Sequence, residues 1–342
     1  MNGSSTHWGV ILAGGSGSRL NTLTTDADGT VIPKQYCSFL GGPTLLRKTI
    51  DRLRVVVDTN RIVIVVSAQH RRWWEPELSD IAPENVIVQP CNRGTACGVL
   101  LPLISILSRD RRARVVVSPS DHFVHDELTL TSSLMAAQTH VDALPDRLVL
   151  LGMVPDRPET GYGWITPSPG HQGAVRGVAS FVEKPDGEVA EELMRSGALW
   201  SSFTFVAAGE TLMNHFRRSM PWLVDKFDRR LEFATGNNRN YALLSLYDRL
   251  PTVDFSRGFL EQAGGSIHVL AVPPCGWTDL GTPERVSACA MRFRCTHHES
   301  ECKSIALESC QTAPEPTPNG THRWSPVDLA EVALRSVESE AI

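Results

Sequence analysis

The stretch that decides the fold of this chain is Trp8-Gly-Val-Ile-Leu-Ala-Gly-Gly-Ser-Gly-Ser-Arg-Leu20, an apolar run that ends in a glycine-rich loop. The apolar run predicts a buried strand, because it is short and bounded by turn residues. Glycines directly after a strand let main-chain N–H groups approach a polyphosphate without Cβ clashes. Arg19 would add guanidinium donors to the same phosphates. We therefore predict a nucleotide-phosphate loop made of Leu12, Ala13, Gly14, Gly15 and Gly17.

Two other glycine-loop chemistries compete with this interpretation. A dinucleotide-binding fold needs G-x-G-x-x-G, but counting from Gly15 the last position is Leu20. A P-loop needs Gly-Lys-Ser or Gly-Lys-Thr at its end, and the chain has neither after these glycines. The remaining interpretation is a loop that holds a nucleotide for attack at its α-phosphorus. Lys34, in Pro33-Lys34-Gln35, could reach the same phosphates.

Further apolar runs predict the rest of the fold. They alternate with amphipathic helical patterns, which indicates an α/β protein with a Rossmann-like, mostly parallel sheet and helices on both faces. Between about residues 155 and 210 strands dominate, which indicates a β-rich insertion. The predicted strands outside the insertion are Trp8 to Ala13, Arg61 to Val66, Asn85 to Val88, Ala113 to Val117, Arg147 to Leu151 and Ile267 to Val272, and those inside it are Tyr162 to Ile165, Val175 to Val182 and Trp200 to Val206.

Length and charge limit the classes of function. The 342 residues are 42% hydrophobic, enough for one large domain, predicted as 1–285, followed by a tail at 286–342 with a linker and a short helix at Val327 to Val337. A net charge of −5 argues against nucleic acid as the main partner. The chain has no run long enough for a membrane span and no signal sequence, so we expect no membrane partner and a cytoplasmic location.

The order of the motifs resembles a known family. Gly-Gly-Ser-Gly-Ser-Arg-Leu followed by Pro-Lys-Gln resembles the signature of the sugar nucleotidylyltransferases, particularly the mannose-1-phosphate guanylyltransferases, and later blocks continue the resemblance to about Arg285. The resemblance implies a nucleotidyltransferase that joins an NTP, expected to be GTP, to a hexose 1-phosphate, expected to be mannose 1-phosphate, with release of pyrophosphate. It implies that Arg19 and Lys34 are catalytic.

A second block resembles the base-binding segment of this family. It is Gln89-Pro-Cys-Asn-Arg-Gly-Thr-Ala96, and its candidate nucleotide-binding residues are Gln89, Asn92, Gly94 and Thr95. Gly94 would let the backbone approach a flat base, and Thr95 could cap a helix that starts at Ala96. An ordinary capped helix start is the alternative.

Two carboxylates are candidate Mg²⁺ ligands. Asp121 follows the predicted strand at Ala113 to Val117, at the sheet edge where open α/β folds bind ligands. Asp279, in Trp277-Thr-Asp-Leu-Gly281, resembles the Asp that completes the metal site in the family. Mg²⁺ prefers oxygen ligands, so His122 is expected to support the site rather than bind the metal. The alternative for Asp279 is a helix N-cap.

The β-rich insertion supplies the candidate sugar-phosphate site. A hexose 1-phosphate needs a cation for its phosphate and acceptors for its hydroxyls, and Lys184 and Glu183 match the family's residues for these roles. Tyr162, Gly163 and Ser202 complete the set that the resemblance implies. The chain departs from the family block Trp-Asn-Ser-Gly-Met-Phe at Ser201, Phe203 and Thr204.

Alternatives to this enzyme remain open. One is a regulatory relative that binds a nucleotide sugar without making it, and another is an enzyme for a different sugar or base. The missing third glycine disfavours an NAD-dependent dehydrogenase. A homodimer is compatible with the sequence but does not follow from it.

Overall fold

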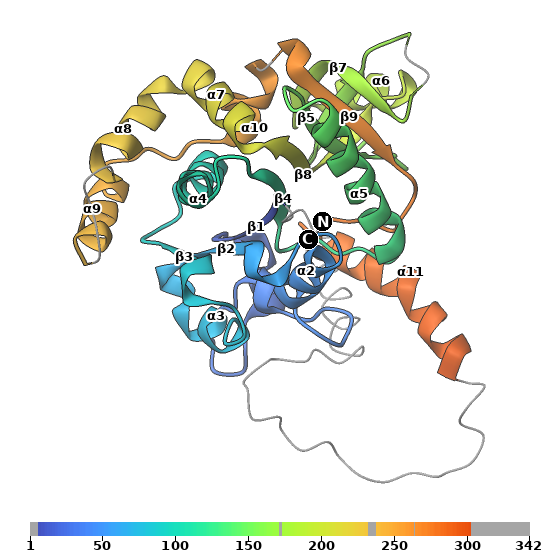
Figure 1. The fold of residues 1–342 in the computed structure, drawn as a ribbon. Coiled ribbons are helices and arrows are strands. Elements are labelled where there is room, and N and C mark those ends of the chain that lie inside the picture. The colour runs from blue at the N-terminus through green and yellow to red at the C-terminus, as the bar shows by residue number, and fades with distance from the viewer. Residues whose placement is uncertain (1–5, 171–172, 232–236, 263, 302–342) are drawn as a thin grey trace, which may run out of the picture.

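One sheet runs through the computed structural model, which describes residues 6–170, 173–231, 237–262 and 264–301 (Figure 1). The strands of this sheet are β1 (His7–Ala13), β2 (Ile62–Ser67), β3 (Val86–Gln89), β4 (Arg114–Pro119), β5 (Leu148–Met153), β6 (Gly163–Pro167), β7 (Val175–Glu183), β8 (Leu199–Ala208) and β9 (Ile267–Val272). Their order across the sheet is β3-β2-β1-β4-β8-β5-β9-β7-β6. Each predicted strand is present, with its ends shifted by no more than a few residues.

The sheet has a parallel half and a mixed half. Strands β3, β2, β1 and β4 are mutually parallel, and so are β5 and β9. Strand β8 runs antiparallel between β4 and β5 and joins the two halves. Of the three strands predicted inside the insertion, β6 and β7 pair with each other and with β8 and β9, whereas β8 itself lies in the centre of the main sheet. Strands β6 and β7 therefore extend the main sheet, and the predicted α/β class is confirmed, with a sheet that is mixed rather than mostly parallel because β6, β7 and β8 pair antiparallel with their neighbours.

Helices lie on both faces of the sheet. They are α1 (Asn21–Thr24), α2 (Leu45–Arg54), α3 (Arg71–Glu77), α4 (Thr95–Arg109), α5 (Glu127–Ala143), α6 (Gly187–Arg195), α7 (Gly209–Ser219), α8 (Pro221–Leu231), α9 (Asn237–Tyr247), α10 (Phe255–Gly258) and α11 (Pro283–Glu301). The predicted boundary at residues 285 and 286 falls inside α11, and the helix predicted at 327–337 lies outside the described residues.

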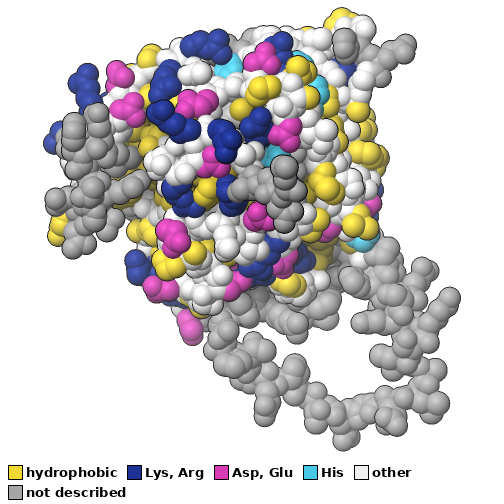
Figure 2. All heavy atoms as spheres, viewed as in Figure 1, with side chains coloured by type: hydrophobic (Ala, Val, Ile, Leu, Met, Phe, Trp, Pro, Cys, Tyr) yellow, Lys and Arg dark blue, Asp and Glu magenta, His cyan; other side chains and the backbone are white. Residues whose placement is uncertain are grey.

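The surface carries both signs of charge. On the face drawn in Figure 2, Lys and Arg side chains lie near Asp and Glu side chains, so charge on that face is locally balanced. Within the described ranges, every helix is too short or too polar to cross a bilayer.

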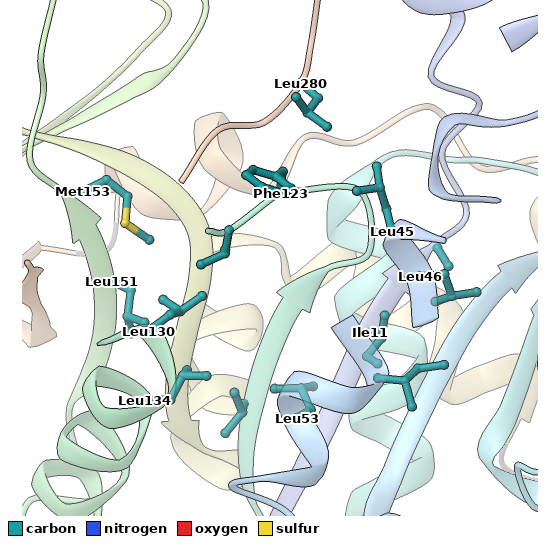
Figure 3. Close-up of a cluster of buried hydrophobic side chains, with 14 of the residues drawn as sticks. Ile11, Leu45, Leu46, Leu53, Phe123, Leu130, Leu134, Leu151, Met153 and Leu280 are labelled. Carbon is teal, nitrogen blue, oxygen red and sulfur yellow. The ribbon is translucent and has the colours of Figure 1, made fainter. Parts of the chain in front are cut away.

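The core consists of two apolar clusters, one on each face of the sheet. Successive side chains of a strand point to opposite faces, so Ile11 and Ala13 of β1 belong to one cluster, while Trp8 and Val10 belong to the other. Figure 3 shows the first cluster, in which side chains from α2 and α5 lie over β1 and β5. Burial on both faces explains why these strands read as continuous apolar runs in the sequence.

Candidate active site

A cleft of about 360 Å³ opens where β1 and β4 end. It continues to the end of β7 and the start of β6, so both halves of the sheet contribute to it. This is the edge at which open α/β sheets bind ligands. The sequence-predicted residues that line the cleft are Leu12, Gly14, Gly15, Arg19, Gln89, Asn92, Gly94, Thr95, Asp121, Tyr162, Gly163, Glu183, Lys184 and Asp279.

The glycine loop is held in place from behind. Gly17 adopts a φ of 63°, and a Cβ there would lie 2.6 Å from Cβ of Lys34, so this close approach requires glycine. The side-chain amide of Gln35 donates to the carbonyl oxygens of Ala13 and Gly15, each at 2.9 Å. Ala13 and Gly17 thus shape the loop but do not line the main cleft. Sequence reasoning assigned no role to Gln35, although it adjoins Lys34 in the same motif.

Two cations serve this side of the cleft in different ways. The Lys34 side chain is buried, and its ammonium donates to Oδ2 of Asp121 at 3.0 Å and to the main-chain oxygen of Asp279. Lys34 therefore links the two candidate metal-binding segments. Arg19 is exposed at the cleft and makes no hydrogen bond or ion pair with another described residue. Its guanidinium is thus available to an anionic ligand.

Both acidic residues are held in their charged form. Burial alone would raise the pKa of Asp121, but Lys34 and His122 outweigh it and lower that pKa below its ordinary value. The pKa of Asp279 is lowered in the same way, because His122, Arg285 and Lys34 outweigh burial. The side chain of Asp121 is 35% exposed and that of Asp279 is 13% exposed. The cleft therefore contains two carboxylates that are ionised at neutral pH.

His122 lies beside these carboxylates, and its side chain is 14% exposed. Burial lowers its pKa below the ordinary value, and its Nε2 is 3.8 Å from Oδ1 of Asp121. Its ring packs edge-on against Trp277, with the ring centroids 5.3 Å apart. These contacts agree with a supporting role.

Asp279 is not a helix cap. Helix α11 begins at Pro283, and the hydroxyl of Thr282 accepts the Arg285 N–H at 3.4 Å, as an N-cap does. Oδ1 of Asp279 instead accepts from the Gly281 N–H at 2.8 Å, from the Tyr162 hydroxyl at 3.0 Å and from Arg285 at 2.7 Å. Capping is thus supplied by another residue, and the carboxylate of Asp279 faces the cleft.

The segment predicted to bind the base is fixed by a distant part of the chain. Gly94 has a φ of 85°, and a Cβ there would clash with the carbonyl oxygen of Val253. Thr95 was expected to cap a helix, and this expectation is wrong: Gly94 is the N-cap residue, and the Thr95 hydroxyl accepts the Phe255 N–H at 2.8 Å. The contact brings Asp254 and Ser256 into the cleft lining, which no sequence signal indicated.

The part of the cleft predicted to bind the sugar phosphate carries a cation–carboxylate pair. The Lys184 ammonium lies 3.6 Å from a carboxylate oxygen of Glu183, and the Lys184 side chain is 53% exposed while that of Glu183 is 11% exposed. Burial raises the pKa of Glu183, and the nearby Lys184 charge opposes that shift. The pair can offer a cation to a phosphate and an acceptor to a hydroxyl.

Ser202 does not reach the cleft, so its predicted role as a sugar contact is corrected. It is fully buried, and its hydroxyl donates to the Leu151 carbonyl oxygen at 2.8 Å. A bulge in β8 between the pairs Leu150–Phe205 and Gly152–Ser201 changes the register of the strands there. Ser201 and Phe203 line the cleft in its place.

Backbone strain also concentrates at the cleft. Among the described residues, the non-glycine positions with positive φ are Lys184 at 50°, Phe203 at 58° and Leu280 at 46°. Lys184 and Phe203 line the cleft, and Leu280 follows Asp279. Left-handed conformations of this kind cost free energy and persist mainly where a functional site requires them. The strain thus supports the location of the site independently of the motifs.

Comparisons with known proteins find relatives over most of the chain. A family model described as nucleotidyl transferase matches residues 8–293. A mannose-1-phosphate guanylyltransferase of Escherichia coli (strain K12) is 30% identical over 282 residues, which are 80% of this chain and 57% of that protein. The alginate biosynthesis protein AlgA of Pseudomonas aeruginosa is 31% identical over 80% of this chain and 56% of its own length. The chain thus spans slightly more than half the length of each of these two relatives.

Solved structures are similar over most of the chain. A Thermus thermophilus protein described as a mannose-1-phosphate geranyltransferase is 30% identical, with a TM-score of 0.71 over 83% of this chain and 80% of that one. A Helicobacter pylori protein described as a mannose-6-phosphate isomerase has a TM-score of 0.64 at 19% identity, which supports the fold alone.

Proposed function

The chain belongs to the nucleotidyl transferase family, and from this premise we propose that it transfers a nucleotidyl group from an NTP to a hexose 1-phosphate, with release of pyrophosphate. One observation carries the proposal. Arg19, Asp121, Lys184 and Asp279 come from distant parts of the chain and line a single cleft, and Lys34 joins the two acidic segments.

The reaction is an in-line displacement. A phosphate oxygen of the hexose 1-phosphate attacks the α-phosphorus, the bond from that phosphorus to the β-phosphate oxygen breaks, and pyrophosphate leaves. The nucleophile is already an anion, so catalysis depends on aligning two anions and neutralising charge. Arg19 serves the triphosphate, Lys34 holds the two acidic segments together behind it, and Lys184 holds the incoming phosphate. The glycine loop presents main-chain N–H groups to the departing phosphates.

We propose Mg²⁺ as the cofactor, held by Asp121 and Asp279. The donors fit, because both residues offer ionised carboxylate oxygens. The hydrogen bonds to the Asp279 carboxylate among the described residues all fall on Oδ1, which leaves Oδ2 for a cation. The described residues include no group of three or more His, Cys, Asp or Glu side chains suited to a metal. Two carboxylates suffice for Mg²⁺, which takes further ligands from substrate phosphates and water. Bound Mg²⁺ would neutralise charge on the triphosphate.

We propose GTP and mannose 1-phosphate as the substrates, because relatives that match most of this chain are named mannose-1-phosphate guanylyltransferases. The lining at Ser201 and Phe203 makes another hexose 1-phosphate the second candidate. The cytoplasmic location and the homodimer remain predictions from the sequence.

Pyrophosphate release from each NTP, with Mg²⁺ and a panel of hexose 1-phosphates, tests the proposal. We expect turnover that depends on both substrates, with GTP preferred. Arg19→Ala should lower kcat/KM by about 10²–10³, the usual effect of removing one donor to developing charge. Binding of a nucleotide sugar without turnover would instead identify the non-catalytic relative.

A further inference from the structure

A buried guanidinium lies behind the cleft, between two acidic residues. Nη1 of Arg285 donates to Oδ1 of Asp279 at 2.7 Å, and Nη2 lies 2.6 Å from Oε1 of Glu159. The side chains of Arg285, Asp279 and Glu159 are 10%, 13% and 14% exposed. The guanidinium also lies over the Tyr162 ring, 4.5 Å from its centroid. Arg285 is absent from the cleft lining, so it acts through its neighbours.

Glu159 organises the loop that leads into β6. Its Oε1 accepts the Gly161 N–H at 2.9 Å, and its main-chain oxygen accepts the indole N–H of Trp164 at 2.8 Å. Gly161, Tyr162 and Gly163 all line the cleft on the sugar side. The position of this cleft wall therefore depends on Glu159.

Asp279, the other carboxylate held by Arg285, is a proposed metal ligand. Arg285, Tyr162 and the Gly281 N–H share its Oδ1. The planar guanidinium has donors on both sides, so it can hold two carboxylates at once, which an ammonium cannot do with the same geometry. Without it, two carboxylates would face each other in a poorly solvated space and repel.

We propose that Arg285 is a positioning residue that couples metal binding at Asp279 to hexose 1-phosphate binding at the 159–163 loop. The inference rests on the proposed function. A bound metal would restrict the position of the Asp279 carboxylate, and this carboxylate restricts the guanidinium of Arg285. The guanidinium in turn holds Glu159, which positions the 159–163 loop. By thermodynamic linkage, each ligand then tightens the binding of the other by the same factor.

The first test measures Mn²⁺ binding by electron paramagnetic resonance, with and without mannose 1-phosphate. Wild-type protein should bind Mn²⁺ more tightly when the sugar phosphate is present. Arg285→Gln should weaken Mn²⁺ binding by about 10–100-fold, the usual effect of removing a side chain that hydrogen-bonds to a metal ligand. In this variant the Mn²⁺ affinity should no longer change when mannose 1-phosphate is added. Arg285→Lys should restore metal affinity in part but not the coupling.

Two further variants separate positioning from folding. Glu159→Ala removes the side-chain acceptor that links Arg285 to the loop, so it should retain most Mn²⁺ affinity and lose the coupling. Arg292→Gln is the matched control on α11, because Arg292 is 65% exposed and its only ion pair within the described residues is a 3.7 Å contact with Asp156. It should behave as wild type. Thermal melting of each variant identifies any that fails to fold.

The outcomes distinguish the two proposals. If the wild-type protein catalyses turnover, and Arg285→Gln keeps the Mn²⁺ affinity and the coupling of the wild type, the proposed role of Arg285 is overturned and the proposed function is not. Absence of wild-type turnover would overturn the proposed function, and the binding measurements would then still decide whether Arg285 couples the two ligands.

Discussion

On the β1–β4 side of the cleft, main-chain groups and the unpaired Arg19 face the ligand while Lys34 is held by Asp121, whereas on the β6–β8 side the cations at the cleft are paired with carboxylates. Arg19 contacts no acidic group among the described residues, while Lys184 lies 3.6 Å from Glu183 and Arg285 bridges two acids. An unpaired cation retains its full attraction for phosphate. A cation that is paired with a carboxylate attracts phosphate less strongly, but it holds that carboxylate in a set orientation. The first side is therefore suited to neutralising a triphosphate, and the second to orienting an acceptor.

The largest expected effect tests the nucleotide side. Lys34→Met removes the ammonium that holds Asp121 and the Asp279 backbone together. We expect kcat/KM to fall by about 10²–10³, or ~2.7–4 kcal/mol. Steady-state pyrophosphate release measures the loss, and Lys226→Met, on the exposed surface of α8, serves as the control. Retention of more than a tenth of wild-type kcat/KM would remove Lys34 from the catalytic set.

A substitution at Gly94, also on the nucleotide side, should mainly lower the stability of the protein. Gly94→Ala places a Cβ against the Val253 carbonyl at a φ of 85°, so we expect a loss of about 1–3 kcal/mol in unfolding free energy. Gly187→Ala is the matched control, because a Cβ there has open space and ordinary φ. Denaturant unfolding should show a loss for the first variant and little change or a small gain for the second. Equal unfolding free energies for the two variants would mean that the close contact between Gly94 and the Val253 carbonyl does not contribute to stability.

On the sugar side, Glu183→Gln should weaken function without weakening the fold. Loss of the charged acceptor should raise KM for the hexose 1-phosphate about tenfold, with KM for the NTP unchanged. Burial raises the pKa of Glu183 in the folded protein, so the folded state holds its proton more tightly than the unfolded state does. Wild-type stability should therefore fall as pH rises from the ordinary carboxyl pKa through this raised value.

Glu183→Gln should lack that pH dependence and should be at least as stable as wild type at pH 7. Thermal melting across pH measures both proteins. A variant that is clearly less stable than wild type at neutral pH would show that the Glu183–Lys184 pair stabilises the fold.

The smallest effect concerns Phe203, whose ring packs edge-on against Phe205 and Phe255. At a φ of 58° an alanine is strained and a glycine is not. We expect Phe203→Gly to be more stable than Phe203→Ala by about 1 kcal/mol, the reverse of the usual order in a strand. Denaturant unfolding measures this difference. Both variants should accept a wider range of hexose 1-phosphates. If Phe203→Ala were instead more stable than Phe203→Gly, the backbone at residue 203 would not be strained.

Much of the fold could be predicted because its strands are locally marked. Runs such as Arg61 to Val66 are apolar on both faces and bounded by polar residues, so each was placed within a few residues of its observed position. The order of the strands could not be predicted. The pairing of Val117 with Phe205 joins segments far apart in the sequence, and no local pattern encodes that choice.

The candidate site divides in the same way. Arg19, Asp121 and Asp279 stand in ordered motifs, and the structure brings them to one cleft. Arg285 is proposed to act through contacts that exist only in the folded chain, and Asp254 joins the cleft lining beside the contact of Phe255 with Thr95, so neither carries a motif. Ser202 failed for a different reason: a bulge in β8 changes which side chains face the cleft, and the linear pattern does not reveal it.

The place of β8 between β4 and β5 has a consequence for how the protein is made. Both strands are synthesised well before β8, so β4 presents an uncovered row of N–H and C=O groups until residue 208 has left the ribosome. Such an edge can pair with the wrong segment or with another nascent chain. The growing polypeptide therefore exposes this edge in the interval between β4 and β8, and late steps of translation complete the centre of the sheet rather than its rim.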